Sequence, residues 1–177
     1  MREVTIARNY AETLFALANT AAAVEAWGDL MDATAGALST PAIEAVLMSP
    51  RVPKERKVMI VLQAMPDAPR PFTLFLAAVI RRSRQLMLGQ IADEYRALVD
   101  VKLNRVRAGV TVAREMDALA RSVLVERLSA AIGKDVIAGF ATDPVLLGGV
   151  VVRIGDRVYD GSVRKRLAVL RHKLLAR

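Results

Sequence analysis

The side chains that could carry chemistry are few, and their spacing brings no partners together. His172, the one histidine, lies in a cationic segment without a carboxylate between residues 162 and 177. Metal sites recruit several ligands, and a general base needs a positioned partner. Asp93 and Glu94 are adjacent, so on a helix they would point to different parts of its surface. Cysteine is absent, which removes thiolate nucleophiles. The sequence therefore predicts no catalytic residue, no metal site and no cofactor.

Gly148 and Gly149 are the next candidates, because glycine-rich loops can cradle phosphate where they lead into the N-terminus of a helix. Here the two glycines precede residues 150–154, a valine-rich segment with the composition of a strand. No lysine followed by serine or threonine lies nearby. Glycine in such a context more often marks a bulge or a close approach of two backbones. We therefore expect a packing role at these positions.

Positive charge is concentrated in the C-terminal part of the chain. The net charge is +8; residues 1–104 hold 12 basic and 11 acidic side chains, and residues 105–177 hold 14 and 7. A basic unit could neutralise the phosphates of a nucleic acid, so nucleic-acid binding stays open as an alternative function. Phe140 and Tyr159 are the evident aromatics on the strands expected there, which supports a base-stacking platform poorly. The basic cluster at residues 81–84 is interpreted as an exposed, solubilising corner between two helices.

The elements that would position these residues begin with helices. Apolar side chains recur at steps of three and four along the first hundred residues, and prolines mark several helix starts. Six helices are predicted, the last running from near Ser83 until Gly109 ends it. The fifth, residues 72–80, is apolar almost all round and is therefore expected at the centre of a bundle.

After Gly109 the pattern changes to short β-branched segments. Gly155 and Asp156 have the spacing of a tight hairpin, and Ser162 is a plausible cap for a final helix. Strands are predicted at 110–113, 135–140, 145–154 and 157–160, with a helix at 116–133. The predicted fold class is thus mainly α with a small α/β C-terminal unit. A six-helix bundle over residues 1–106 is followed by a short-stranded sheet with helices over residues 107–177.

Membrane and targeting signals are weak in this sequence. The longest apolar run, residues 72–80, has nine residues, whereas a bilayer span needs roughly 18 to 20. The first residues include Glu3 and Glu12 and lack the pattern of a targeting peptide. We therefore expect the chain to stay in the compartment where it is made.

Three segments together resemble a known family. They are ARNYAETLFALA at residues 7–18, Trp27 in the second predicted helix, and GGVVVRIGDRVYDGSVRKRLAVL at residues 148–170. This combination resembles the delta subunit of bacterial F-type ATP synthases, the relative of mitochondrial oligomycin-sensitivity-conferring protein. The resemblance runs in order along the whole chain. Two positions depart from the usual pattern, Asn9 where proline is common and Gln85 where leucine is usual.

The resemblance implies a non-catalytic stator subunit of the peripheral stalk, which keeps the catalytic head from turning with the rotor during proton-coupled ATP synthesis. In this family the helical domain binds the N-terminal helix of an alpha subunit, and the C-terminal domain holds the ends of the membrane-anchored b subunits. The protein would then lie at the cytoplasmic face of the bacterial plasma (inner) membrane, associated with it through the complex. Nucleic acid is not an implied partner.

Candidate contact residues follow from the first helix and from the basic final helix. In the first helix, Tyr10 and its alanine neighbours form a small-residue face that a partner helix could approach closely. With the resemblance, this face predicts that the alpha-subunit helix binds at or beside Ala7, Tyr10, Ala11, Leu14, Trp27, Phe75 and Val79. The b-subunit stalk is predicted to dock through the basic residues Arg164, Arg166, Arg171 and Lys173, which could attract acidic helices.

Overall fold

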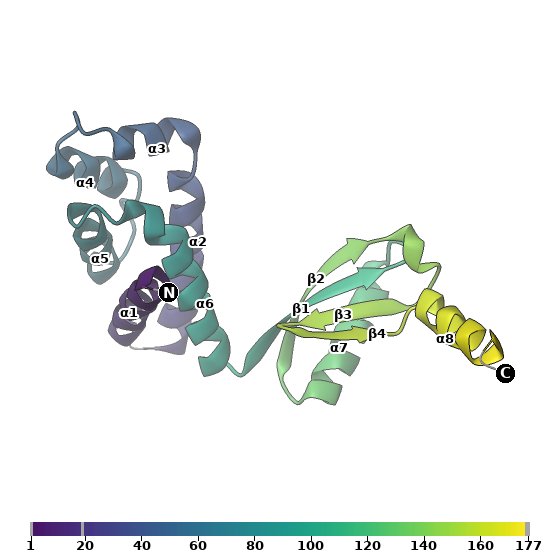
Figure 1. The fold of residues 1–177 in the computed structure, drawn as a ribbon. Helices are drawn as coiled ribbons and strands as arrows, with labels where there is room; N and C mark the ends of the chain where they lie inside the picture. The colour runs from purple at the N-terminus through teal and green to yellow at the C-terminus, as the bar shows by residue number, and fades with distance from the viewer. Residues whose placement is uncertain (1, 19, 176–177) are drawn as a thin grey trace. The chain divides into compact units, whose positions relative to one another are not determined.

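The computed structural model describes the backbone of residues 2–18 and 20–175 (Figure 1). It divides the chain into two units, Met1–Val99 and Asp100–Arg177. In the described residues the chain is mainly helical, and a four-stranded sheet lies in the second unit. The predicted fold class, a helical part followed by a small α/β part, is confirmed.

Six α-helices make up most of the first unit as described. Two of their starts carry residue types that favour helix N-termini. Thr20 accepts a hydrogen bond from the Ala23 amide at 3.1 Å, and Pro41 occupies the first position of its helix. The helices are α1 (Arg2–Leu17), α2 (Ala21–Leu38), α3 (Pro41–Met48), α4 (Lys54–Gln63), α5 (Arg70–Arg81) and α6 (Leu88–Lys102). A short 3-10 helix, η1 (Gln85–Met87), leads from α5 into α6.

The core of the helical unit is built around α5. Six side chains of α5 are buried, and one of them, Phe72, meets the Trp27 ring edge-on with the centroids 6.1 Å apart. Tyr95 of α6 is also fully buried, and its hydroxyl donates to the Val24 carbonyl oxygen at 3.0 Å. Burial raises the pKa of Tyr95 to about 12. Residues 72–80 form part of the core as predicted, but Leu74 and Ala78 lie on an exposed face of α5.

The sixth helix ends earlier than the sequence pattern predicts. α6 stops at Lys102, and Asn104 has a φ of +51°, a left-handed conformation that terminates helices. The prediction of a helix continuing to Gly109 is wrong, because strand β1 (Arg105–Val112) has already begun. Asparagine adopts positive φ more readily than most residues, so Asn104 is the stop signal that the periodicity obscures.

The second unit contains a four-stranded mixed sheet with the strand order β2-β1-β3-β4. β1 pairs in parallel with β2, so the chain between them must cross over, and α7 makes that crossing. β3 pairs antiparallel with both β1 and β4. Figure 1 shows α7 against one face of the sheet. The bounds are α7 (Ala118–Ile132), β2 (Asp135–Thr142), β3 (Val150–Ile154) and β4 (Arg157–Asp160).

One face of this sheet carries the core of the second unit. Alternate residues of β1 point to that face, as the two-residue period of a strand requires, and are buried with one valine from each neighbouring strand. The buried set is Ala108, Val110, Val112, Val136 and Val152. Partly buried apolar side chains of α7 pack against it. The second unit therefore has an apolar core of its own.

The strand predicted over residues 145–154 is shorter in the structure. Pro144–Leu146 forms a 3-10 turn, η2, and β3 follows Gly149. The longer prediction is wrong because Gly149 has a φ of +80°, which an extended strand does not accept. A Cβ atom at Gly149 would collide with the carbonyl oxygen of Gly161. The close backbone packing expected at the glycine pair is confirmed at this position.

Among the described residues, no helix has both the length and the apolar character needed to cross a bilayer.

Candidate partner-binding surfaces

The residues predicted to receive the alpha-subunit helix lie mostly inside the helical bundle. Six of the seven are buried: Ala7, Ala11, Leu14, Trp27, Phe75 and Val79. A buried side chain contacts another chain only if the bundle opens, so these six hold α1, α2 and α5 together. Any surface that a partner meets must come from their exposed neighbours.

Tyr10 is the predicted residue that reaches the surface. Its hydroxyl oxygen accepts hydrogen bonds from Arg82 at 3.1 Å and from Arg84 at 3.0 Å. The Tyr10 ring meets Phe75 edge-on with the centroids 6.1 Å apart, and the Arg84 guanidinium lies 5.4 Å from the ring centroid. The predicted exposed corner at residues 81–84 is confirmed for Arg82 and wrong for Arg84, which is half-buried over the Tyr10 ring. Both arginines tie the end of α5 to α1.

A hollow of about 230 Å³ lies beside this cluster, lined by Ile6, Asn9, Tyr10, Thr13, Arg82 and Arg84. On α1, four side chains at steps of three and four form one stripe through Tyr10, and on α5 a stripe at steps of four leads to Arg82. Because Arg82 contacts Tyr10, the two stripes meet at the hollow. We call the combined set the α1–α5 surface: Ile6, Tyr10, Thr13, Leu17, Leu74, Ala78 and Arg82.

Two leucines of the α1–α5 surface are exposed although apolar. Leu17 of α1 is 44% exposed, and Leu74 is 60% exposed on an otherwise well-buried α5. Sequence reasoning missed both, because the periodicity of α1 and α5 shows apolar faces without showing which side chains other helices cover. The signal for Leu74 is only indirect: a helix that is apolar all round has more apolar surface than one core can bury.

The final helix, α8 (Val163–Leu175), is amphipathic but buries none of its side chains. Its apolar stripe, Val163, Leu167, Leu170 and Leu174, is exposed, with values from 38% at Val163 to 67% at Leu174. The four predicted basic contacts are exposed as well: Arg164, Arg166, Arg171 and Lys173. Figure 1 shows α8 extending away from the sheet of its own unit. The apolar stripe is therefore free to be covered by another chain.

The start of α8 is firmly held by hydrogen bonds. Ser162 accepts from the Lys165 amide at 3.1 Å, which confirms the predicted cap. Asp160 accepts from the Ser162 amide at 2.9 Å, and the Val163 amide donates to the Gly148 carbonyl oxygen at 3.0 Å. The hydrogen bonds from Ser162, followed by the nearby basic side chains, lower the pKa of Asp160. The first turn is thus fixed while the rest of α8 is exposed.

The side chains considered for chemistry stay apart. His172 is exposed on α8, and Asp93 pairs with Arg96 of its own helix at 3.1 Å. In the part of the chain that the structure describes, no group of three histidine, cysteine or carboxylate side chains is arranged to hold a metal.

Comparison with known proteins decides between the open alternatives. The family model described as ATP synthase delta (OSCP) subunit matches residues 6–174. The chain belongs to this ATP synthase delta (OSCP) family. It is 42% identical over 172 residues to ATP synthase subunit delta of Gemmatimonas aurantiaca, covering 96% of this chain and 93% of that protein. It is 39% identical over 173 residues to the subunit delta of Anaeromyxobacter dehalogenans, covering 96% and 97%.

A solved structure supports the fold along nearly the whole chain. A chain of the mitochondrial ATP synthase hexamer of Toxoplasma gondii aligns with a TM-score of 0.66 at 20% identity, covering 97% of this chain and 98% of that one. Membership of the delta (OSCP) family makes the protein a structural, non-catalytic component of the peripheral stalk. ATP synthesis and ion transport belong to the complex, and the membrane association of this subunit is indirect. The nucleic-acid alternative has no support from the family or the fold.

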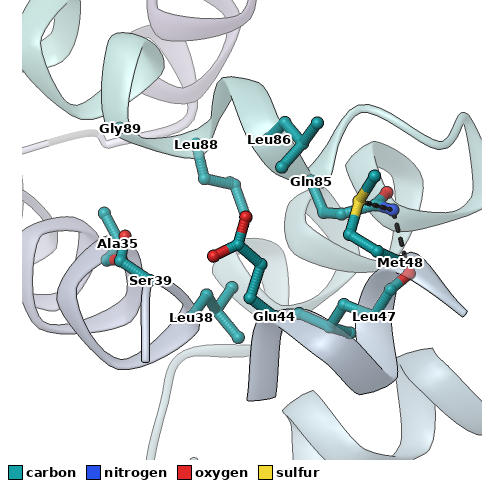
Figure 2. A pocket seen from close by; sticks show the side chains of 10 residues that line it. All are labelled: Ala35, Leu38, Ser39, Glu44, Leu47, Met48, Gln85, Leu86, Leu88 and Gly89. Atoms are coloured by element: carbon teal, nitrogen blue, oxygen red, sulfur yellow. Dashed lines mark hydrogen bonds between the residues drawn. The ribbon is translucent and has the colours of Figure 1, made fainter. Parts of the chain in front are cut away.

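A second hollow, of about 170 Å³, is lined by side chains of α2, α3, η1 and α6, Gln85 among them. Figure 2 shows Gln85 beside Leu47 and Met48 at the end of α3, and Glu44 of the same helix with its carboxylate near Leu88. The Gln85 amide nitrogen donates to the Leu47 carbonyl oxygen at 3.1 Å. Its carbonyl oxygen, Oε1, is buried and has no hydrogen-bond partner among the residues that the structure describes. Gln85 therefore ties η1 to α3 and leaves one buried acceptor unpaired.

Proposed function

We propose that this subunit connects the N-terminal helix of an alpha subunit to the ends of the b subunits, at the cytoplasmic face of the bacterial inner membrane. The helical unit binds the alpha helix along the α1–α5 surface, and α8 binds the stalk. The observation that carries the proposal is the uncovered apolar stripe of α8. Exposed leucines at helical spacing are what a partner helix buries when it docks.

Apolar contacts must supply most of the affinity, because a stator resists torque for as long as the rotor turns. A surface ion pair contributes only about 0–1 kcal/mol, whereas burying a leucine side chain contributes about 1.5–3 kcal/mol. In this division of roles the leucines of α8 hold the stalk. The basic residues of α8 speed the encounter with acidic helices and orient them.

The stripe of α8 is tested by the double variant Leu167→Ser/Leu170→Ser. We expect its affinity for a C-terminal fragment of the b subunit to fall by at least about tenfold. The thermal unfolding of the protein should stay unchanged, since both leucines are exposed. Leu119→Ser on α7 is a matched control, because Leu119 is exposed but lies outside α8. Equal affinity of the double variant and the wild type would reject the assignment of α8.

The basic residues of α8 are tested separately by reversing charges at Arg166 and Arg171. We expect weaker binding of the same b fragment and a smaller dependence on salt, because screening acts on exposed charges. If binding and its salt dependence are unaltered, these side chains serve solubility alone.

The α1–α5 surface is tested with a synthetic peptide of the alpha subunit's N-terminal helix. Titrated into the whole protein, it should shift the amide resonances of α1 and α5 and leave those of the sheet in place. Undisturbed signals from both helices at saturation would reject this surface. Copurification of the tagged protein with the ATP synthase head checks the same interaction in the cell.

A further inference from the structure

Arg82 and Arg84 come together on one uncharged oxygen atom. Both guanidinium groups donate to the Tyr10 hydroxyl, at 3.1 and 3.0 Å. Arg84 is half-buried and lies over the Tyr10 ring, while Arg82 is exposed. Each guanidinium has five N–H donors, and one N–H of each is used in these bonds. Most of the donors of this pair therefore remain available at the surface.

The pair lacks a counter-ion within the described residues. Neither Arg82 nor Arg84 forms an ion pair with a carboxylate there, whereas Arg96 and Arg107 each pair with an aspartate. Two cations held close to one another repel, and an anion bound between them reduces that repulsion. Because the Tyr10 oxygen accepts both hydrogen bonds, its own hydrogen is left to donate. The cluster thus presents two cations and one hydroxyl donor to the same side.

A carboxylate matches these donors best. Guanidinium groups bind carboxylates through two parallel N–H···O bonds, which are shorter and stronger than bonds between neutral groups. The hollow beside the cluster, about 230 Å³ in volume, admits such a group, and Ile6 and Thr13 form part of its wall. Apolar side chains flank it along α1 and α5, with Leu17 and Leu74 exposed. The surroundings therefore fit an acidic side chain carried on an apolar helix better than a free anion.

We propose that the Tyr10–Arg82–Arg84 cluster is a carboxylate site, which binds one aspartate or glutamate of the helix that docks on the α1–α5 surface. This inference rests on the proposed function of that surface and adds to it. The apolar stripes supply the affinity for the helix, and the single carboxylate fixes the register of that helix along α1 and α5. A helix with the same apolar face but no acid at that position binds more weakly and in more than one register.

The test is a double-mutant cycle with the whole protein and the alpha N-terminal peptide. Each acidic residue of the peptide is changed to its amide, one at a time, and affinities are measured by calorimetry. We expect one amide peptide to bind wild-type protein about tenfold more weakly, the size of a lost charge-assisted hydrogen bond. The Arg84→Gln protein should bind that amide peptide and the parent peptide with equal affinity. For the Tyr10→Phe protein, the difference in affinity between the two peptides should be intermediate.

Controls separate the carboxylate site from a loss of structure and from the proposed function itself. Arg56→Gln removes an exposed arginine from α4 and should bind like wild type. Fluorescence of the single, buried Trp27 reports whether each variant stays folded, and Arg84→Lys keeps the charge if Arg84→Gln does not fold.

Each outcome decides something. If the parent peptide does not bind wild-type protein, the proposed function of the surface fails, and the carboxylate site fails with it. If the parent binds but no amide peptide is weaker, or the loss is the same on Arg84→Gln, the carboxylate site alone is overturned. If sodium acetate shifts the Tyr10 and Arg84 resonances but no peptide acid matters, the cluster is a free-anion site and the proposal is again overturned.

Discussion

Two tyrosines of the helical unit show how surroundings decide what one residue type does. Tyr95 is fully buried in α6 and donates its hydroxyl hydrogen to a backbone carbonyl of α2, so it acts as part of the core. Tyr10 lies at the surface, and its oxygen accepts from two arginines. Both follow the helical spacing of apolar residues in the sequence. The neighbouring residues therefore determine both the raised pKa of Tyr95 and the carboxylate binding proposed at Tyr10.

Burial of Tyr95 predicts a loss of stability at alkaline pH. Its folded-state pKa, about 12, lies above the ordinary tyrosine value of 10.0. The folded state therefore holds the proton more tightly, and stability falls as the pH rises from about 10 to about 12. The free energy of unfolding of Tyr95→Phe should be lower by about 1 kcal/mol near neutral pH, the value of one hydrogen bond. It should not show the decrease in stability between about pH 10 and about pH 12 that Tyr95 causes.

Urea unfolding followed by Trp27 fluorescence at about pH 8 and about pH 11 measures both effects of Tyr95→Phe. Tyr159→Phe is the matched control, because Tyr159 is exposed and its hydroxyl is already in water. An identical alkaline loss in wild type and Tyr95→Phe would contradict the prediction.

A further prediction concerns Gln85, whose amide nitrogen forms a hydrogen bond while its amide oxygen has no partner among the described residues. Gln85→Leu gives up the hydrogen bond to Leu47 but also removes the buried unpaired acceptor. We expect its free energy of unfolding to stay within about 1 kcal/mol of wild type. Gln85→Glu keeps the shape, loses the donor and adds a charge, so it should destabilise by about 2 kcal/mol or more. Chemical denaturation of both variants measures the difference, and equal losses would show that the Leu47 bond dominates.

At the scale of elements, α5 and α8 use apolar residues in opposite ways. α5 packs against neighbouring helices and buries six side chains, whereas α8 buries none and presents a stripe of leucine and valine to solvent. Helical spacing alone indicates an apolar face in both. The number of neighbours differs, and neighbours are a property of the fold. An element that is apolar and uncovered is the stronger candidate for contact with another chain.

The N-terminus of α8 is predicted to loosen in acid. The pKa of Asp160 is lowered in the folded state, mainly by the hydrogen bonds from Ser162. The ionised Asp160 therefore contributes its full stabilisation of the fold above the unfolded-state pKa, about 3.9. That stabilisation is lost as the pH falls through the lower folded-state pKa. The amide resonance of Ser162 should titrate with a midpoint below the ordinary pKa of an aspartate.

Two variants check the assignment of that titration. Asp160→Asn should abolish the movement of the Ser162 amide, because the ionisable partner is gone. Asp156→Asn, in the turn between β3 and β4, should leave the movement unchanged. A midpoint in wild type at or above the ordinary pKa of an aspartate would contradict the prediction.

At the scale of the whole molecule, the chain is two units, each with an apolar core of its own. The near-neutral helical unit and the basic sheet unit suit different partners. We propose that the domain boundary lies in the turn at residues 103–104, where α6 has ended and β1 has not begun. The sequence-based boundary, between residues 106 and 107, cuts β1.

Two C-terminal fragments distinguish these boundaries. Residues 105–177 keep all of β1, whereas residues 107–177 lose the pairs Arg105↔Asp135 and Val106↔Val136. We expect the longer fragment to be more stable, because Val106 packs against the core and Arg105 pairs with Asp135 at 3.2 Å. Thermal unfolding followed by circular dichroism measures the difference. If the two fragments unfold alike, the boundary after residue 106 is the better one.

The sequence by itself determined the elements whose signals are local. Proline at helix starts, the Ser162 cap and β-branched runs depend on atoms a few residues apart, so the helices, most strands and the family were predicted. Asn104 shows the limit of periodicity, since a single left-handed residue ended a pattern that looked continuous.

Only the tertiary structure decided which apolar residues face the core and which face a partner. Helical spacing marks Leu14 and Leu17 alike, yet one is buried and the other exposed, because burial depends on the helices packed alongside. The meeting of Arg84 with Tyr10 joins residues 74 positions apart. No local pattern encodes such a contact, since it depends on how the end of α5 packs beside α1.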